Sequence, residues 1–203
     1  MVKISPLNLK GCKIYKGYLN KTAQESLLND VRGIVRNAPL FSPMTPWGKP
    51  MSVKMTSAGK YGWLSDKTGY RYSREHPNGI AWPMIPPSIM KIWADICPSN
   101  PEAECCLVNF YQDGAKMGLH QDKDEKDFSH PVLSISLGDD ALFRIGGVQK
   151  SDPTESLWLS SGDVLVMSGE SRLAYHGIDR VKYGSSQLLK VAGRINLTLR
   201  VVD

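Results

Sequence analysis

The sequence lacks the patterns that mark several classes of protein. Its four cysteines form no Cys-x-x-Cys pair, and Cys105 and Cys106 are adjacent, which argues against a zinc ribbon and a disulfide framework. The first ten residues contain no apolar core like that of a signal peptide, and no stretch approaches the length that spans a bilayer. We therefore expect a protein of the reducing cytoplasm with no membrane partner.

The size and the charge of the chain are less specific. Its 203 residues suffice for a single domain with a substantial core, and nothing in the sequence requires more than a monomer. The formal net charge of +5 and the pI near 9.0 favour a polyanionic partner without identifying it. The sequence contains no internal repeat and no low-complexity tract.

Two segments have the apolar spacing of helices. Residues 22–25 form a capping-box pattern, Thr-x-x-Glu, and apolar residues follow at helical spacing until Pro39. These features predict a helix over residues 23–37, which we expect to pack against a sheet and to carry no chemistry. A second helix is expected to begin within residues 86–88 and to end before Pro98, because proline suits a helix start and blocks helix continuation.

From about residue 105 onward, the apolar pattern changes to period two, in short runs separated by turn-forming residues. Eight short strands at this spacing favour a jelly roll made of two sheets. The sequence therefore predicts an α+β fold, with a jelly-roll core over about residues 105–203 and both helices in an extension over about residues 1–104. The expected core strands are 105–111, 119–122, 132–137, 142–145, 156–159, 163–168, 173–176 and 194–202, and earlier strands are expected near 12–15 and at 51–56.

A histidine and a carboxylate lie two positions apart at His120 and Asp122. In a strand, side chains at i and i+2 leave the same face about 7 Å apart, so both could bind one metal ion. A 2-His-1-carboxylate site needs a second histidine and leaves positions open for oxygen and a cosubstrate. His176 is the candidate, because a jelly roll places the ends of distant strands around one mouth. The alternative is a packed polar cluster that holds no metal.

The last expected strand has one polar face. Alternation places Arg194, Asn196, Thr198 and Arg200 on one side of this strand and aliphatic residues on the other. Guanidinium groups bind carboxylates through paired hydrogen bonds, so a face with two of them suits a dicarboxylate.

Taken together and in order, these motifs resemble the AlkB family of iron(II)- and 2-oxoglutarate-dependent nucleic-acid dealkylases. The likeness rests on the segments 109–111, 120–125, 169–176 and 194–200, and it extends from about Pro50 to the end of the sequence. Among the branches of that family, the single-domain bacterial proteins are the most similar. The resemblance implies a double-stranded β-helix buttressed by helices on one side, with iron(II), 2-oxoglutarate and molecular oxygen as cofactor and cosubstrates.

The resemblance also implies roles for individual residues. The far carboxylate of 2-oxoglutarate would pair with Arg194, and Arg200 would act near the metal-proximal carboxylate as part of the catalytic centre. The iron would be bound by the three metal-type side chains His120, Asp122 and His176. The remaining hydrogen bonds of the buried dianion would come from Asn109, Tyr111 and Asn196.

Residues 57–87 mix aromatic side chains with cations and many turn formers. Such a mixture is what a surface needs to stack a base and to hold phosphates. The plainer alternative is that the aromatics anchor an irregular segment to the core. The resemblance favours a nucleotide-recognition segment. It implies that Trp63 stacks on a flipped base and that Asp124 faces the exocyclic amine of that base. It also implies that the backbone or phosphate is held by Tyr70, Arg71 and Tyr72. Lys150 would be a cation on the substrate side.

Three functions are compatible with these residues. The leading one is oxidative demethylation of 1-methyladenine and 3-methylcytosine in single-stranded DNA, with release of formaldehyde, succinate and carbon dioxide; double-stranded DNA and RNA stay open as further partners. The second applies the same chemistry to RNA, a protein or a small molecule. The third is a nucleic-acid-binding module without catalysis, which the full set of metal-type ligands disfavours. Outside the site, Glu170 and Arg172 are expected to form a surface ion pair.

Overall fold

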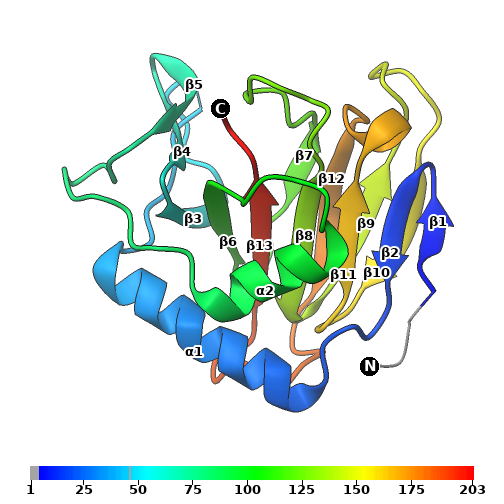
Figure 1. The fold of residues 1–203 in the computed structure, drawn as a ribbon, viewed down its shortest axis with the longest axis horizontal. Helices are drawn as coiled ribbons and strands as arrows, with labels where there is room; N and C mark the ends of the chain where they lie inside the picture. Colours follow the sequence, from blue (N-terminus) through cyan, green and yellow to red (C-terminus); the bar gives the residue numbers. More distant parts are fainter. Residues whose placement is uncertain (1–4, 46) are drawn as a thin grey trace.

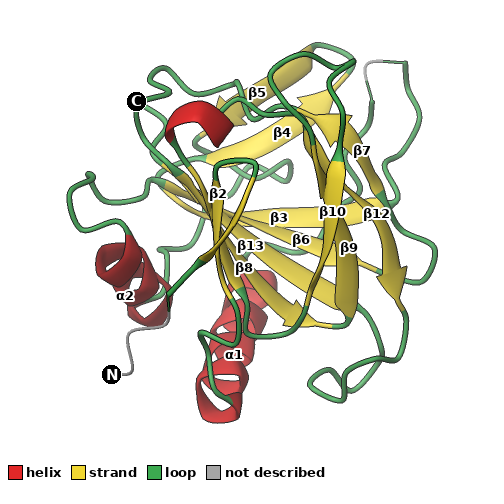
Figure 2. Cartoon of the chain, turned by 90° about the vertical axis from the view of Figure 1, so that its right-hand side faces the viewer, coloured by secondary structure: helices red, strands yellow, loops and turns green. Residues whose placement is uncertain are grey.

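The computed structural model describes residues 5–45 and 47–203, which form two facing β-sheets, a separate hairpin and two helices (Figures 1 and 2). The larger sheet has seven strands in the order β1-β2-β11-β8-β13-β6-β3, and the smaller sheet has four in the order β10-β9-β12-β7. Neighbouring strands in both sheets are antiparallel. This arrangement confirms the predicted double-stranded β-helix with two buttressing helices.

The larger sheet takes strands from both halves of the chain. It consists of β1 (Leu7–Leu9), β2 (Cys12–Tyr15), β3 (Val53–Gly59), β6 (Cys105–Tyr111), β8 (Val132–Gly138), β11 (Val164–Met167) and β13 (Arg194–Arg200). The smaller sheet consists of β7 (Met117–His120), β9 (Asp140–Ile145), β10 (Glu155–Leu159) and β12 (His176–Lys182). The hairpin pairs β4 (Gly62–Asp66) with β5 (Gly69–Ser73) and stands at one end of the sheets.

Both expected helices are present. Helix α1 spans Lys21–Asn37 and α2 spans Pro87–Ile96. The predicted capping box at residues 22–25 is wrong, because α1 starts earlier: Asn20 is the N-cap, and its side-chain oxygen accepts a hydrogen bond from the backbone N–H of Ala23 at 2.9 Å. Neither helix of the described chain is long and apolar enough to cross a membrane.

The larger sheet separates two apolar cores. The first lies between its outer face and the helices, where Leu28 of α1 and Trp93 of α2 pack in one cluster with Leu197 of β13. The second lies between the two sheets and includes Met55 of β3 and Phe143 of β9. The aliphatic side chains of β13 belong to the first core, so the polar face of this strand points into the space between the sheets. This confirms the alternation predicted for β13.

Several local predictions differ from the structure. The strand expected at 173–176 is wrong: β12 begins at His176, and a 3-10 turn (η1, Gly169–Ser171) precedes it. There, the Ser171 hydroxyl accepts from the Ser168 N–H at 3.1 Å and donates to the Ser168 carbonyl at 3.0 Å, so local side-chain bonds turn the chain. The strand expected at 119–122 is displaced, because β7 ends at His120. Neither β1 nor the β4–β5 hairpin was predicted.

Candidate active site

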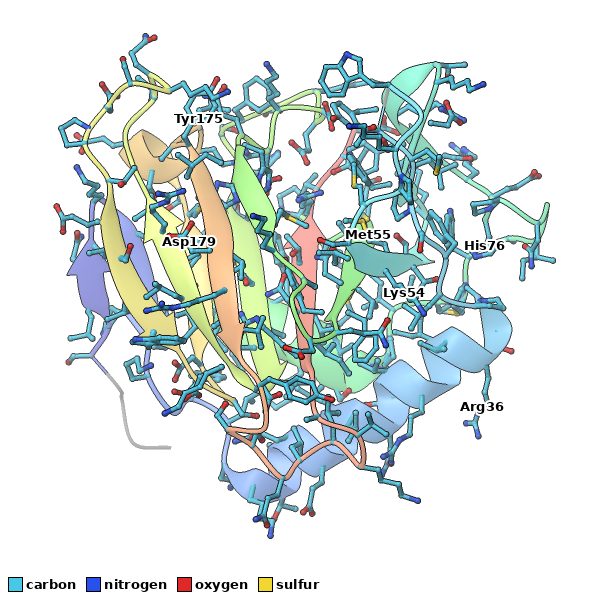
Figure 3. The ribbon with its side chains drawn as sticks, turned by 180° about the vertical axis from the view of Figure 1, so that it is seen from behind. Arg36, Lys54, Met55, His76, Tyr175 and Asp179 are labelled. Carbon is cyan, nitrogen blue, oxygen red and sulfur yellow. The ribbon has the colours of Figure 1, made fainter. Side chains whose placement is uncertain are left out.

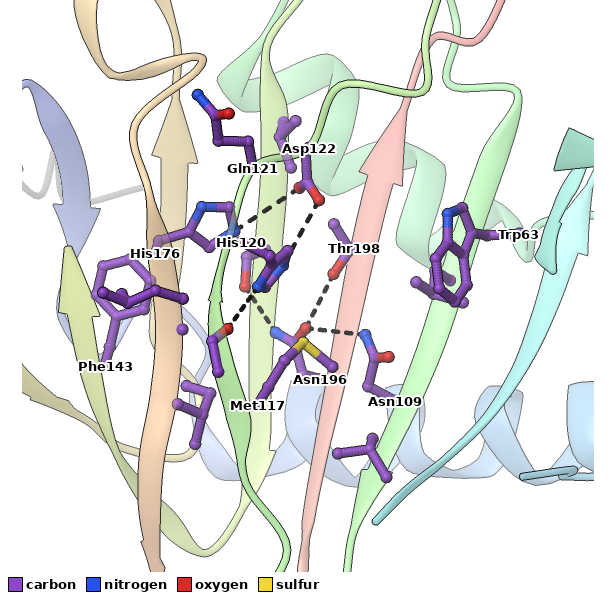
Figure 4. Close-up of a pocket in the computed structure, with 18 of the residues that line it drawn as sticks. Trp63, Asn109, Met117, His120, Gln121, Asp122, Phe143, His176, Asn196 and Thr198 are labelled. Atoms are coloured by element: carbon purple, nitrogen blue, oxygen red, sulfur yellow. Dashed lines mark hydrogen bonds and ion pairs between the residues drawn. The ribbon is translucent and has the colours of Figure 1, made fainter. Parts of the chain in front are cut away.

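Three metal-type side chains meet at the open end of the two sheets. His120 is the last residue of β7 and His176 the first of β12, and the two residues are paired across these neighbouring strands. Asp122 lies beyond the end of β7, and its carboxylate oxygens lie 3.8 Å from Nε2 of each histidine (Figure 4). The three ligand atoms all lie within 4.8 Å of one another, a separation that one metal ion can bridge.

The backbone orients both imidazole rings. Nδ1 of His120 lies 2.9 Å from the Gly118 carbonyl, and Nδ1 of His176 lies 3.0 Å from the Ala174 carbonyl. Because a carbonyl can only accept, each Nδ1 carries the proton and each Nε2 presents its lone pair to the site. This tautomer is the one that binds a metal through Nε2.

The electrostatic surroundings keep the ligands in the form that binds a metal. Burial lowers the pKa of His176 to about 4, so its imidazole is neutral near pH 7. Burial alone would raise the pKa of Asp122, but the positive charge of Arg200 holds it below its ordinary value. The Arg200 guanidinium contributes directly, with Nη2 at 2.8 Å from Asp122 Oδ1.

Deeper between the sheets lies a polar cradle with unused hydrogen-bonding groups. Arg194 is 1% exposed; its Nη2 donates to the Ser136 hydroxyl at 2.9 Å, while Nε and Nη1 have no partner within the described chain. Asn109 donates to Asn196 at 3.4 Å and leaves its own carbonyl oxygen unpaired among the described residues. A buried guanidinium without a counter-ion is costly, and burial lowers its pKa. The cradle therefore fits a carboxylate ligand such as 2-oxoglutarate.

A single cavity of about 500 Å³ contains both groups of residues. Arg194 and the metal-type ligands line its inner part, while Trp63 and Tyr70 of the hairpin line its outer part. Tyr175 also borders the cavity, and Figure 3 shows Tyr175 and the hairpin at the same end of the sheets. The indole of Trp63 faces the ligands from across the opening (Figure 4).

Comparison with known proteins decides the family. The family model of the 2OG-Fe(II) oxygenase superfamily matches residues 11–200. The chain is 51% identical over 191 residues to the alpha-ketoglutarate-dependent dioxygenase AlkB homolog of Caulobacter vibrioides, which is 94% of this chain and 87% of that protein. This chain belongs to the AlkB family. The enzyme is accordingly a dioxygenase that uses iron(II), 2-oxoglutarate and molecular oxygen.

More distant members of the AlkB family are also similar along most of the chain. The solved structure of OsALKBH1 matches with a TM-score of 0.82 at 32% identity, covering 96% of this chain and 98% of that one. The DNA N(6)-methyladenine demethylase ALKBH1C of Arabidopsis thaliana is 31% identical over 221 residues, covering 94% of this chain and 48% of that protein.

Three of the substrate contacts expected for this AlkB-family enzyme gather at the cavity. The rings of Trp63 and Tyr70 are stacked, with centroids 5.4 Å apart and an interplanar angle of 19°. The Trp63 indole N–H donates to a carboxylate oxygen of Asp124 at 2.8 Å. All three side chains line the cavity.

The other three expected contacts do not line this cavity. Arg71 is exposed and forms an ion pair with Asp66, 2.6 Å from Nη2 to Oδ2. Tyr72 points inward, where its hydroxyl donates to the carboxylate of Glu125. Lys150 is exposed between β9 and β10.

One buried residue was placed wrongly from the sequence, and two others were overlooked. Arg172 is not part of a surface pair with Glu170: it is 2% exposed and ion-paired with Glu125, at 3.0 Å. Glu125, itself buried, was quoted only as part of a motif. Ser136, the partner of Arg194, was also missed; the signal was a pair of serines two positions apart, Ser134 and Ser136, on one face of an otherwise apolar strand.

Proposed function

We propose that this AlkB-family enzyme demethylates 1-methyladenine and 3-methylcytosine in DNA, preferentially in single strands. The observation that carries this proposal is the stacked pair Trp63 and Tyr70, which borders the same cavity as the candidate iron ligands. An aromatic face contributes roughly 1–3 kcal/mol per stacked base, independently of sequence. A base turned out of its strand could therefore lie on Trp63 with its methyl group directed toward the iron.

The charge of the cavity suits an alkylated base. Methylation at N1 of adenine or N3 of cytosine gives the ring a positive charge at neutral pH. Asp124 places a carboxylate at the same opening, where it attracts such a ring and can accept from its exocyclic amine. This charge preference would separate an alkylated base from an unmodified one.

The inner residues would bind the cofactors. We assign the iron to His120, Asp122 and His176, and the far carboxylate of 2-oxoglutarate to the unpaired donors of Arg194. Asn109, Tyr111 and Asn196 would complete the hydrogen bonds of the dianion, and Arg200 would steady the metal-proximal end. When bound, the two cofactors supply the oxidation of the methyl group by molecular oxygen, after which formaldehyde leaves and the base is restored. Burial of the cradle between the two sheets would limit the access of water to this reaction.

Other features agree with the proposal. A plant relative of this chain is called a DNA N(6)-methyladenine demethylase. All four cysteines are free and buried, as suits the cytoplasm. We propose a monomer with a single domain, in which an extension over about residues 1–104 carries the helices and the nucleotide-recognition segment, and about residues 105–203 form the catalytic jelly-roll core. Arg71, Tyr72 and Lys150 stay as proposed contacts of the strand, although none lines the cavity.

The proposal is tested by measuring formaldehyde and succinate together. The purified enzyme is supplied with iron(II), ascorbate and 2-oxoglutarate, and with a single-stranded DNA oligonucleotide that carries one 1-methyladenine. We expect equal amounts of formaldehyde and succinate with this strand and almost none with the unmethylated strand. His120→Ala and Asp122→Ala should each abolish formaldehyde release while leaving the circular dichroism spectrum unchanged.

Three results would contradict the proposal in different ways. Succinate without formaldehyde on every methylated strand would retain the dioxygenase and exclude this substrate. Faster turnover of the same lesion in an RNA oligonucleotide would make RNA the natural polymer. Full activity of Asp122→Ala would remove Asp122 from the iron site.

A further inference from the structure

Behind the candidate iron site lies a cluster of buried charges, two of which, Glu125 and Arg172, have no role in the assigned chemistry. Glu125 and Arg172 are 6% and 2% exposed, and Arg200 is 6% exposed. Together with Asp122 they make a set of two carboxylates and two guanidinium groups, so their charges balance. Charged side chains are rarely buried unless they are paired, and here each has a partner of opposite sign.

Glu125 connects this cluster to the recognition hairpin. Its Oε1 accepts from the hydroxyl of Tyr72, which lies on β5. The same hydroxyl accepts from Nη1 of Arg200 at 3.1 Å, and Arg200 Nη2 lies 2.8 Å from Asp122. A continuous path of hydrogen bonds and ion pairs therefore runs from the hairpin to a candidate iron ligand.

Arg172 holds the other side of the cluster. Its Nη2 donates to Glu125 at 3.0 Å and its Nη1 donates to the backbone carbonyl of Asp122 at 2.7 Å. Its Nε donates to the carbonyl of His130 at 2.8 Å. Because Arg172 follows η1 and precedes His176 by four positions in the sequence, one guanidinium links the backbone that carries Asp122 to the segment that leads to His176.

We propose that Glu125 and Arg172 are positioning residues, which couple the position of the β4–β5 hairpin to that of the iron ligand Asp122. Tyr72 is the contact on the hairpin. The proposal rests on the assigned roles of Asp122 and the hairpin. Displacement of the hairpin when a base enters would shift the Tyr72 hydroxyl, and Arg200 and Glu125 would transmit the shift to Asp122. The enzyme would thus align its iron for oxygen use only when a base lies on Trp63.

Two side chains on the path, Tyr72 and Glu125, can be tested by different substitutions. Tyr72→Phe removes only a hydroxyl, so the hairpin loses its link to Glu125 and Arg200 while its packing is kept. Glu125→Gln keeps the size of the side chain but removes the charge that balances Arg172. Tyr61→Phe is the matched control, because Tyr61 packs edge-on against Tyr72 with ring centroids 6.5 Å apart, yet its hydroxyl bonds to Asp203 and not to the cluster.

Two measurements on each variant report whether the hairpin is still coupled to Asp122. The first is the ratio of succinate to formaldehyde with the methylated strand, which reports whether oxidation of 2-oxoglutarate stays coupled to substrate. The second is an anaerobic titration of iron(II) with 2-oxoglutarate, read from the metal-to-ligand charge-transfer band. We expect Tyr72→Phe to raise the ratio several-fold with nearly unchanged iron affinity. Glu125→Gln should weaken iron binding by about tenfold, because it removes the charge that balances Arg172 and Arg200, the two side chains that contact Asp122.

A double-variant cycle gives the decisive result. If Tyr72 acts through Glu125, the Tyr72→Phe/Glu125→Gln protein should have the same ratio as Glu125→Gln alone. Additive effects, or a Tyr72→Phe ratio equal to that of Tyr61→Phe, would overturn the proposal. Thermal unfolding of each variant shows whether it is folded, and Tyr72→Phe alone decides the matter if Glu125→Gln does not fold. A wild-type enzyme that releases no formaldehyde from DNA would instead refute the proposed substrate, leaving the iron titration as the test of Glu125.

Discussion

The indole N–H of Trp63 donates to the carboxylate of Asp124 across 2.8 Å. Trp63 lies on the β4–β5 hairpin and Asp124 lies two residues after Asp122, so this bond joins the hairpin to the segment of the candidate iron ligands. It also fixes the plane of the indole at the opening of the cavity. The relationship explains how a short hairpin outside both sheets could present a rigid stacking surface.

Loss of the Trp63 ring should slow turnover of the methylated strand but not turnover of 2-oxoglutarate in the absence of DNA. We expect Trp63→Ala to lower kcat/KM for a methylated strand by about tenfold to hundredfold, because one stacked base contributes roughly 1–3 kcal/mol. Succinate formation without DNA should be nearly unchanged. Trp158→Ala is the matched control: Trp158 lies on β10, where Arg180 stacks on its ring, and it is absent from the cavity lining. An equal loss of both activities in Trp63→Ala would speak against base stacking.

Substitution of Arg194 should have opposite effects on two properties: the free protein should become more stable, and binding of the cosubstrate should be lost. Because two nitrogens of its buried guanidinium have no partner in the described part of the chain, Arg194→Met should raise the free energy of unfolding of the cosubstrate-free protein by roughly 1–4 kcal/mol. The same change should abolish the stabilisation by 2-oxoglutarate, which for the wild type reaches about 2.7 kcal/mol at a concentration of 100 times Kd. Urea denaturation with and without 2-oxoglutarate measures both effects. A variant that is still stabilised by 2-oxoglutarate would place the cosubstrate elsewhere.

Gly177 should be needed for the spacing of the two histidines. A Cβ at this position would lie 2.5 Å from the Met117 carbonyl oxygen on the neighbouring strand β7. Gly177→Ala should therefore push β7 away from β12 and weaken iron(II) binding by about tenfold or more. In contrast, a Cβ on Gly118, in β7, meets nothing within 4 Å, so Gly118→Ala should bind iron normally. Similar iron affinity in the two variants, measured by titration, would show that this contact does not set the site.

The cysteine thiols should be unreactive until the protein unfolds. Burial raises the pKa of Cys12 and Cys97 to about 11 and that of Cys105 to about 12, so almost no thiolate is present at pH 8. We expect a thiol reagent such as DTNB to modify no cysteine rapidly in the native enzyme and all four in urea. Rapid labelling of Cys12 or Cys97 without urea would show that its surroundings open in solution.

The regular parts of the fold were predictable because their signals are local. The strand at Cys105–Tyr111 was predicted with its exact bounds, and the helix from Pro87 was predicted within one residue of its start. The β4–β5 hairpin was missed, because β4 buries residues on both of its faces and β5 buries none, so neither short strand has a clear period of two. The start of α1 was misplaced, because two residues near its N-terminus, Asn20 and Thr22, can both act as caps.

The sequence by itself determined the chemistry that this protein offers: two imidazoles, a carboxylate and an arginine-bearing polar strand face, since residue type and alternation are properties of the chain alone. Only the tertiary structure decided which groups meet. Pairing of β7 with β12 brings His120 beside His176, and burial between the sheets leaves Arg194 without a counter-ion among the residues that the structure describes. Tyr72 faces Glu125 and Arg172 lies buried beneath Asp122, because contacts between distant segments, which no local pattern encodes, determine what covers each side chain.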